Sequence, residues 1–262
     1  MGAASFLHRP MRAVGKDVHR VGLSLNFGLP LPGVEAAFER GINYVFWQRS
    51  ARRALPIMRR ALARDREKMV IAAGPTLAYF GGSVRRGAEA LLKELGTDYL
   101  DVLQIYWAGR MSVLSEAVLS ELVKLREEGK ARSIGLSIHD RPRAGELALA
   151  SPFDVLMIRY NAAHPGAEKD IFPNLAKRQP SVVAYTATSW RKLLRAPRGW
   201  DDKPATAGDC YRFCLSSEHV DVVLMGPRSE AELTENLAAL EKGPLSAEED
   251  AWMRRFGNAV HG

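Results

Sequence analysis

The chain has 262 residues, is 47% hydrophobic and carries a formal net charge of +7. This length and apolar content can form one sizeable core, so we expect a single domain over residues 1–262. No uninterrupted apolar run approaches the ~18 residues of a membrane span, which excludes a membrane-spanning chain and leads us to expect a soluble, cytoplasmic protein.

The basic residues occur in short clusters, as at positions 49–53, 59–60, 85–86 and 191–198. An excess of positive charge can serve a nucleic acid, an anionic cofactor or an anionic substrate. These clusters are dispersed along predicted helices, without an RNA-binding motif or a helix-turn-helix, so we expect most of them to be solvated. The expected partner is therefore a small-molecule substrate, and nucleic acid binding remains a distant alternative.

Two cysteines, Cys210 and Cys214, lie four residues apart on one face of a predicted helix. A disulfide at that spacing would need unsuitable Cβ geometry, so we expect free buried thiols. No further Cys or His stands nearby at a useful spacing, so we expect no metal site.

Eight short apolar runs with β-branched residues recur along the chain and predict eight strands. In chain order they cover residues 21–25, 42–46, 69–73, 100–106, 133–137, 155–158, 182–185 and 220–225. Helical patterns follow them at residues 34–39, 51–63, 84–95, 112–128, 144–150, 169–177, 205–215 and 230–240. Alternating strands and helices favour a parallel sheet with helical crossovers.

Eight such repeats favour closure into a (β/α)8 TIM barrel, of the α/β class, over an open doubly wound sheet. A further helical pattern at residues 245–256 lies outside the eight units and predicts an additional C-terminal helix packed on the barrel. The Pro-containing stretch at residues 195–204 is expected to be a loop after the seventh strand.

An ordered set of short motifs runs from about Gly22 to Leu240. Residues 41–47 read GINYVFW, 70–74 VIAAG, 101–107 DVLQIYW, 134–139 IGLSIH, 183–186 VAYT and 226–229 GPRS. The set resembles the aldo-keto reductase family, whose members typically read GINFFDTA, VIATK, DLYQIHW and IGVSNF at their second to fifth strands. The resemblance implies a barrel that reduces carbonyls with NADP(H).

All four positions of that family's catalytic tetrad differ here. By the resemblance, Phe46, a residue near Ala51, Gly74 and Tyr106 stand where the family has Asp, Tyr, Lys and His. In the family the Tyr donates the proton, and the Lys lowers its pKa. Phe46 and Gly74 have no ionisable side chain, so this proton relay cannot operate here.

The resemblance also implies an NADP(H) site near the ends of the later strands. Its expected members are Ser137, Tyr185, Thr186, Gly226, Arg228 and Asn236. Arg228 would bind the adenosine 2′-phosphate through its guanidinium fork, although a surface ion pair with Glu232 is the plain alternative. Ile138 and Met157 stand where the family has amides, so we expect weakened contacts to the nicotinamide.

Residues at the expected strand ends suggest a remodelled pocket. Tyr106 and His139 are the candidates for a proton donor or acceptor, although each has a structural alternative: Tyr106 fills space, and His139 helps to cap the next helix with Asp140. A substrate pocket is expected to be walled by Phe46, Trp47, Arg49 and Trp107, although Arg49 can equally begin a solvated helix.

Three hypotheses follow. The leading one is an NADP(H)-dependent oxidoreductase with an atypical active site and proton donor, acting on a small carbonyl, imine or activated alkene, because orientation alone can promote hydride transfer to a pre-activated acceptor. The second is a catalytically silent barrel that binds NADP(H) or a metabolite. The third is a redox-neutral enzyme, such as a cyclase, isomerase or dehydratase, that reuses the pocket.

Overall fold

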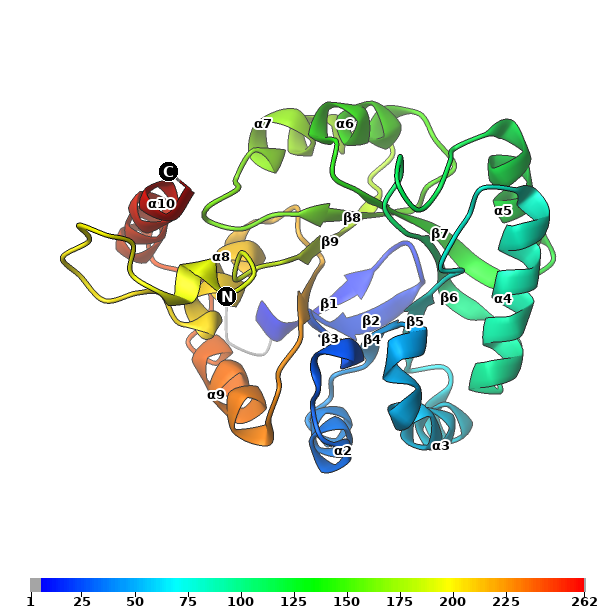
Figure 1. The fold of residues 1–262 in the computed structure, drawn as a ribbon, viewed down its shortest axis with the longest axis horizontal. Coiled ribbons are helices and arrows are strands. Elements are labelled where there is room, and N and C mark those ends of the chain that lie inside the picture. The colour runs from blue at the N-terminus through cyan, green and yellow to red at the C-terminus, as the bar shows by residue number, and fades with distance from the viewer. Residues whose placement is uncertain (1–5, 262) are drawn as a thin grey trace.

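The computed structural model describes residues 6–261, and its centre is a closed barrel of eight parallel strands (Figure 1). The strands are β3 (Val21–Ser24), β4 (Tyr44–Trp47), β5 (Val70–Ala73), β6 (Leu100–Ile105), β7 (Ala131–Ile138), β8 (Val155–Arg159), β9 (Ser181–Tyr185) and β10 (Val222–Met225). Each pairs with its neighbour in chain order, and β10 closes the ring against β3. The predicted barrel and all eight predicted strands are therefore confirmed.

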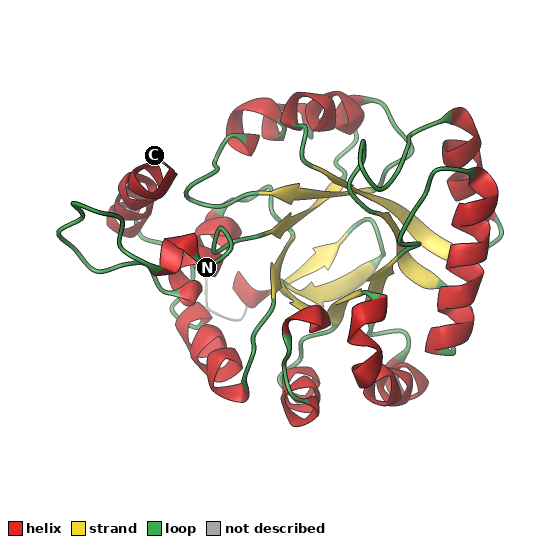
Figure 2. Ribbon diagram, viewed as in Figure 1, coloured by secondary structure: helices red, strands yellow, loops and turns green. Residues whose placement is uncertain are grey.

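Helices surround this ring of strands on the outside (Figure 2). They are α2 (Leu31–Glu39), α3 (Leu55–Asp65), α4 (Gly81–Leu95), α5 (Glu116–Glu127), α6 (Arg141–Leu149), α7 (Ala167–Asp170), α8 (Ala207–Ser216), α9 (Glu230–Leu240) and α10 (Ala247–His261). Short 3₁₀ turns add η1 (Leu25–Phe27), η2 (Arg49–Ala54), η3 (Phe172–Asn174) and η4 (Lys192–Leu194).

The bounds of several helices differ from the predicted ones, and in two of them the local cause is clear. The helix expected at 112–128 begins only at Glu116, because Ser115 caps it by accepting a hydrogen bond from the Val118 N–H. The helix expected at 169–177 is instead the short α7 followed by η3, which contains Pro173. Proline lacks an N–H and clashes with the preceding turn, so a continuous helix through this position was the wrong prediction.

The eight-stranded ring separates two apolar layers. Inside it, side chains such as Tyr44, Val70, Val102 and Val222 pack together. Outside it, the alternate strand positions pack against the helices in a larger cluster. This two-sided burial explains why the strands read as continuous apolar runs in the sequence.

A β-hairpin that the sequence did not predict joins the inner layer. Strands β1 (His8–Met11) and β2 (Lys16–His19) pair antiparallel, and they lie within the outline of the strand ring in Figure 1. Met11, Val14 and Val18 are buried and pack with the inner side chains. The hairpin therefore closes one end of the barrel and leaves the carboxyl ends of the strands as the open end.

The additional C-terminal helix is present as α10, at the edge of the molecule in Figure 1. The Arg212 guanidinium of α8 donates to both carboxylate oxygens of Glu249, at 2.7 and 2.8 Å. The Trp252 and Phe256 rings stack on each other, and Phe256 is fully buried. These contacts fix α10 to the barrel, as expected.

Within residues 6–261, no helix has both the length and the apolar character that crossing a bilayer requires.

Candidate functional site

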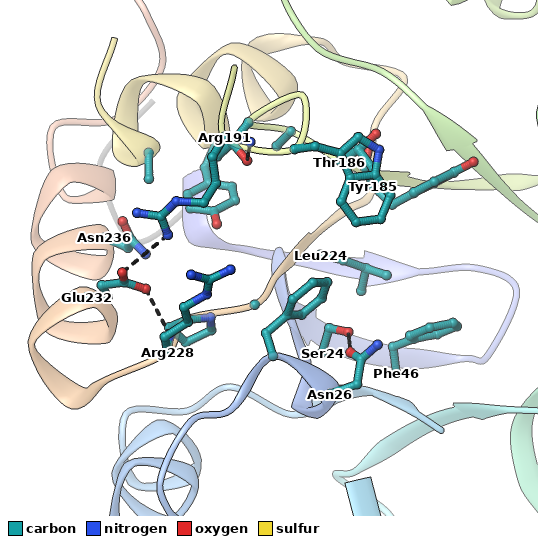
Figure 3. Close-up of a pocket in the computed structure, with 18 of the residues that line it drawn as sticks. Ser24, Asn26, Phe46, Tyr185, Thr186, Arg191, Leu224, Arg228, Glu232 and Asn236 are labelled. Atoms are coloured by element: carbon teal, nitrogen blue, oxygen red, sulfur yellow. Dashed lines mark hydrogen bonds and ion pairs between the residues drawn. The ribbon is translucent and has the colours of Figure 1, made fainter. Parts of the chain in front are cut away.

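A cavity of about 590 Å³ opens at the carboxyl ends of the barrel strands. Its walls come from strand ends around the ring, including Ser24 of β3, Phe46 of β4, Ser137 of β7, Tyr185 of β9 and Leu224 of β10. Figure 3 shows several of these side chains converging on the cavity. This end of a parallel barrel is where the loops that carry chemistry gather.

Most of the residues expected from the sequence line this one cavity. They are Phe46, Tyr106, Trp107, Ser137, His139, Tyr185, Thr186, Gly226, Arg228 and Asn236. The structure therefore brings together residues that are up to 190 positions apart in the chain, counting from Phe46 to Asn236. Their roles in binding or chemistry remain predictions.

Trp47 and Arg49 are not among the cavity residues, which corrects the expected pocket. Trp47 is fully buried in the outer layer, because successive side chains on a strand point to opposite faces and its neighbour Phe46 faces inward. Arg49 begins η2 and is exposed to solvent, which is the alternative considered for it from the sequence.

The Tyr106 hydroxyl is hydrogen-bonded to the backbone on two sides. It accepts from the Gly74 N–H at 3.1 Å and donates to the Trp47 carbonyl at 3.2 Å. Burial raises the pKa of Tyr106 well above its ordinary value. The hydroxyl thus ties the ends of β4, β5 and β6 together, and its proton is already engaged with a backbone carbonyl.

Gly74 lies where its backbone almost touches the neighbouring strand. A Cβ at this position would overlap the backbone carbonyl of Gln104. No side chain of any kind fits there unless the backbone moves. A lysine, which the family resemblance places at this position, would therefore not fit on the backbone found here.

His139 and Tyr185 form a close polar pair in the cavity. The Tyr185 hydroxyl lies 2.7 Å from His139 Nε2, and the two rings meet edge to face. Burial, together with Arg159 and Arg110, lowers the pKa of His139, so this imidazole is neutral near pH 7. Burial raises the pKa of Tyr185 to about 12, so the phenol keeps its proton at that pH.

Aromatic rings form the walls around this pair. The Trp107 ring lies 4.8 Å from that of His139, and Phe46 meets Tyr106 edge to face at 5.7 Å. Trp107 adopts a left-handed backbone conformation, with φ of 37°, so that two consecutive residues, Tyr106 and Trp107, both face the cavity. His139 does not cap α6, because Asp140 accepts the hydrogen bond from the Arg143 N–H by itself.

The opposite end of the cavity, beside α9, is polar and charged. The Glu232 carboxylate accepts from the backbone N–H of Arg228 at 2.9 Å and from Arg191 Nη1 at 3.4 Å (Figure 3). The Arg228 guanidinium has no carboxylate within ion-pair distance among the described residues. The expected alternative of an Arg228–Glu232 side-chain ion pair is therefore replaced by an Arg191–Glu232 pair.

Asn236 adds a buried amide to the same end. Its Nδ2 donates to the thioether sulfur of Met225 at 3.5 Å. Thioether sulfur is a weak acceptor, so this amide keeps most of its capacity to bind a ligand.

Sequence reasoning missed a polar chain on the β3 side of the cavity. The Ser24 hydroxyl donates to Asn26 Oδ1 at 2.6 Å, and Asn26 Nδ2 donates to Gln48 Oε1 at 2.7 Å. Both Ser24 and Asn26 follow from the rule that residues at the carboxyl ends of barrel strands line the site. Trp190, 70% exposed at the cavity, gave no comparable signal.

Residues 6–261 contain no group of three or more His, Cys, Asp or Glu side chains placed to hold a metal ion.

Comparison with protein families finds one match: residues 33–196 fit the model of the Aldo/keto reductase family. Among curated proteins, the methylglyoxal reductase YeaE of Escherichia coli (strain K12) is 29% identical over 118 residues. That alignment covers 44% of this chain and 41% of the relative, so the chain matches less than half the length of the curated relative.

Among solved structures, the holo form of the aldo-keto reductase AKR11C1 from Bacillus halodurans is similar, with a TM-score of 0.78, 19% identity and 95% of each chain covered. The glycerol dehydrogenase AKR11B4 from Gluconobacter oxydans gives a TM-score of 0.77 at 18% identity, covering 98% of this chain and 97% of the other. At these identities the likeness establishes the fold.

Proposed function

Because the chain belongs to the aldo-keto reductase family, we propose that it binds NADP(H) and reduces a small carbonyl, imine or activated alkene through an atypical proton donor. One observation supports this most. The six residues expected to contact the cofactor, namely Ser137, Tyr185, Thr186, Gly226, Arg228 and Asn236, all line the same cavity as His139 and Tyr106.

The residues beside α9 fit the adenosine end of a dinucleotide. Among residues 6–261, the Arg228 guanidinium has no carboxylate partner, and the buried Asn236 amide donates only to a sulfur atom. A guanidinium suits a phosphate, and a buried amide gains from a stronger acceptor. These two groups would hold the adenosine part.

The central part of the cavity fits the nicotinamide less fully. Ser137 offers a hydroxyl and Tyr185 an aromatic ring, whereas Ile138 and Met157 are apolar where amides were expected. When bound, the cofactor would supply a hydride. The protein would contribute by orienting the reactants between the aromatic walls and by supplying a proton.

The His139–Tyr185 pair is the best proton source in the cavity. Both groups are neutral near pH 7, and when His139 Nε2 carries the hydrogen it donates to the Tyr185 oxygen. The phenol hydrogen is then free to point at a ligand atom. With a pKa of about 12, Tyr185 is a weak general acid, which favours substrates that need little protonation, such as activated carbonyls, iminium ions and enones.

A catalytically silent NADP(H)-binding barrel is the second candidate. The backbone hydrogen bonds of the Tyr106 hydroxyl favour it, because the one aromatic hydroxyl at a former tetrad position serves the barrel itself. A redox-neutral enzyme would need turnover without the cofactor, and no contact in the cavity favours that reaction over reduction.

The test is NADPH consumption with methylglyoxal, a cyclic imine and an enone, using the wild type, Tyr185→Phe and Tyr106→Phe. Removing a general acid costs roughly 10²-fold or more in turnover, so we expect that loss in Tyr185→Phe with acceptors whose reduction requires a proton. Tyr106→Phe should keep turnover within a few-fold and lose about 1 kcal/mol of stability.

The controls separate the candidates. Binding of NADPH with no turnover of any acceptor would favour the silent barrel. Normal turnover in Tyr185→Phe together with its loss in a folded Tyr106→Phe would move the proton donor to Tyr106.

A further inference from the structure

Glu232, in the first turn of α9, places a carboxylate inside the cavity. Its two oxygens are held separately, one by the backbone N–H of Arg228 and the other by the Arg191 guanidinium (Figure 3). The side chain is partly buried and lines the cavity. The protein itself thus supplies an anion to this end of the cavity.

The donors that hold this carboxylate are also those that suit a phosphate. They comprise a backbone N–H at a helix N-terminus and a guanidinium, with the second guanidinium of Arg228 close by. One carboxylate now occupies the N–H and the Arg191 group. A phosphate that binds here would either displace the Glu232 carboxylate from these donors or be repelled by its negative charge.

The backbone around Arg191 has a strained conformation. Ser189, Trp190 and Arg191 have φ values of 49, 56 and 68°, so three consecutive residues other than glycine adopt the left-handed region. Such a backbone is uncommon for residues other than glycine and persists only where the surrounding structure holds it in place. Here it directs the Arg191 guanidinium across the cavity to Glu232 of α9.

We propose that Glu232 competes with the 2′-phosphate of NADPH and so determines how far the protein prefers NADPH over NADH. This proposal rests on the proposed function, since it assumes that a dinucleotide occupies the cavity. A carboxylate repels the 2′-phosphate but accepts hydrogen bonds from the ribose hydroxyls of NADH. Arg191 and Arg228 attract the phosphate, and Glu232 offsets that attraction.

The experiment compares the dissociation constants of NADPH and NADH in the wild type, Glu232→Gln and Glu230→Gln. Glu230→Gln removes the same charge from the same turn of α9 at an exposed residue outside the cavity. In Glu232→Gln the ratio of the NADH to the NADPH dissociation constant should rise by about tenfold or more. In Glu230→Gln the ratio should stay within about twofold of the wild type, because an exposed charge is screened by salt.

Three other results would overturn the proposal, and the last of them would overturn the proposed function as well. If Glu232→Gln changes the affinities for both cofactors equally, or weakens NADPH selectively, Glu232 does not compete with the 2′-phosphate, while dinucleotide binding itself stands. If neither cofactor binds to any of the three folded proteins, both this proposal and the proposed function fail.

Discussion

At the residue scale, the surroundings of Gly74 exclude a lysine at the position where the resemblance places the catalytic lysine of the family. The backbone N–H of Gly74 donates to Tyr106, and a Cβ there would overlap the carbonyl of Gln104. The backbone carbonyl of Gln104 therefore occupies the space that the Cβ of a lysine would need. A Gly74→Lys substitution therefore cannot restore the family's lysine unless the backbone moves.

Gly74→Ala should be destabilising by about 2 kcal/mol or more, because overpacking at a rigid backbone contact forces neighbouring strands apart. Urea unfolding followed by tryptophan fluorescence measures this change. Gly82→Ala is the matched control, since the nearest atom to its added Cβ is the flexible end of Arg86 at 3.5 Å. Equal stability of the two variants would show that β5 and β6 can separate freely.

The direction in which each strand-end side chain points was only partly predictable from the sequence. Phe46 and Trp47 were both expected in the pocket, yet strand alternation allows only one of two neighbours to face inward. Tyr106 and Trp107 both face the cavity because Trp107 has a left-handed backbone, which its residue type does not indicate. The pairing of His139 with Tyr185 joins β9 to the residue that follows β7, and no short-range pattern encodes it.

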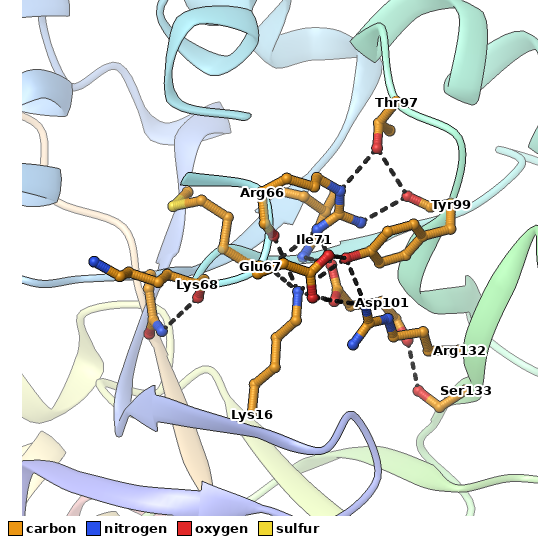
Figure 4. A network of polar contacts seen from close by, with 12 residues as sticks. Lys16, Arg66, Glu67, Lys68, Ile71, Thr97, Tyr99, Asp101, Arg132 and Ser133 are labelled. Atoms are coloured by element: carbon orange, nitrogen blue, oxygen red, sulfur yellow. Dashed lines mark hydrogen bonds and ion pairs between the residues drawn. The ribbon is translucent and has the colours of Figure 1, made fainter. Parts of the chain in front are cut away.

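At the element scale, the β1–β2 hairpin is the main feature that the sequence did not reveal. Each strand has only four residues and is rich in charged and polar groups, so neither gives an apolar run. The hairpin is held instead by long-range polar contacts. Lys16 of β2 pairs with the fully buried Asp101 of β6 at 2.7 Å, and Asp101 also accepts from Arg66 and from the Ile71 N–H (Figure 4).

His19, the last residue of β2, makes the attachment of this hairpin sensitive to acid. Burial, with a smaller contribution from His8, lowers the pKa of His19 from 6.5 to about 4. The unfolded chain therefore takes up a proton between these values while the folded protein does not. The contribution of neutral His19 to the free energy of unfolding is therefore complete above pH 6.5 and is lost as the pH falls towards 4.

We expect the free energy of unfolding to fall by about 2 kcal/mol between pH 7 and about pH 4.5 through His19 alone. Glutamine cannot be protonated, so the free energy of unfolding of His19→Gln should fall by about 2 kcal/mol less than that of the wild type over the same pH range. Urea titrations of both proteins at the two pH values provide the measurement. An identical loss in wild type and variant would rule out His19 as the acid-sensitive group and leave His139 and His164, whose pKa values are also lowered.

At the scale of the whole molecule, the barrel was predictable because every strand is buried on both faces and repeats the same strand–helix unit. The strand ends then fix which loops meet, so most of the expected cavity residues were found together. The arrangement of the charged side chains within the cavity was less predictable from the sequence. The sequence pointed to Arg228 as an anion-binding residue, whereas the structure shows that the carboxylate of Glu232 contacts Arg191 and the backbone N–H of Arg228.

The central proposal is that a dinucleotide binds along this cavity, with its adenosine end beside α9. The most direct measurement is a titration of the purified protein with NADPH, following the quenching of tryptophan fluorescence and the emission of the cofactor, with Arg228→Ala as the comparison. We predict saturable binding by the wild type and a loss of about tenfold in Arg228→Ala, because a guanidinium contact to a phosphate is removed. Absence of binding with both NADPH and NADH at millimolar concentration would contradict the proposal and point to a barrel that has kept the fold of its family without its cofactor.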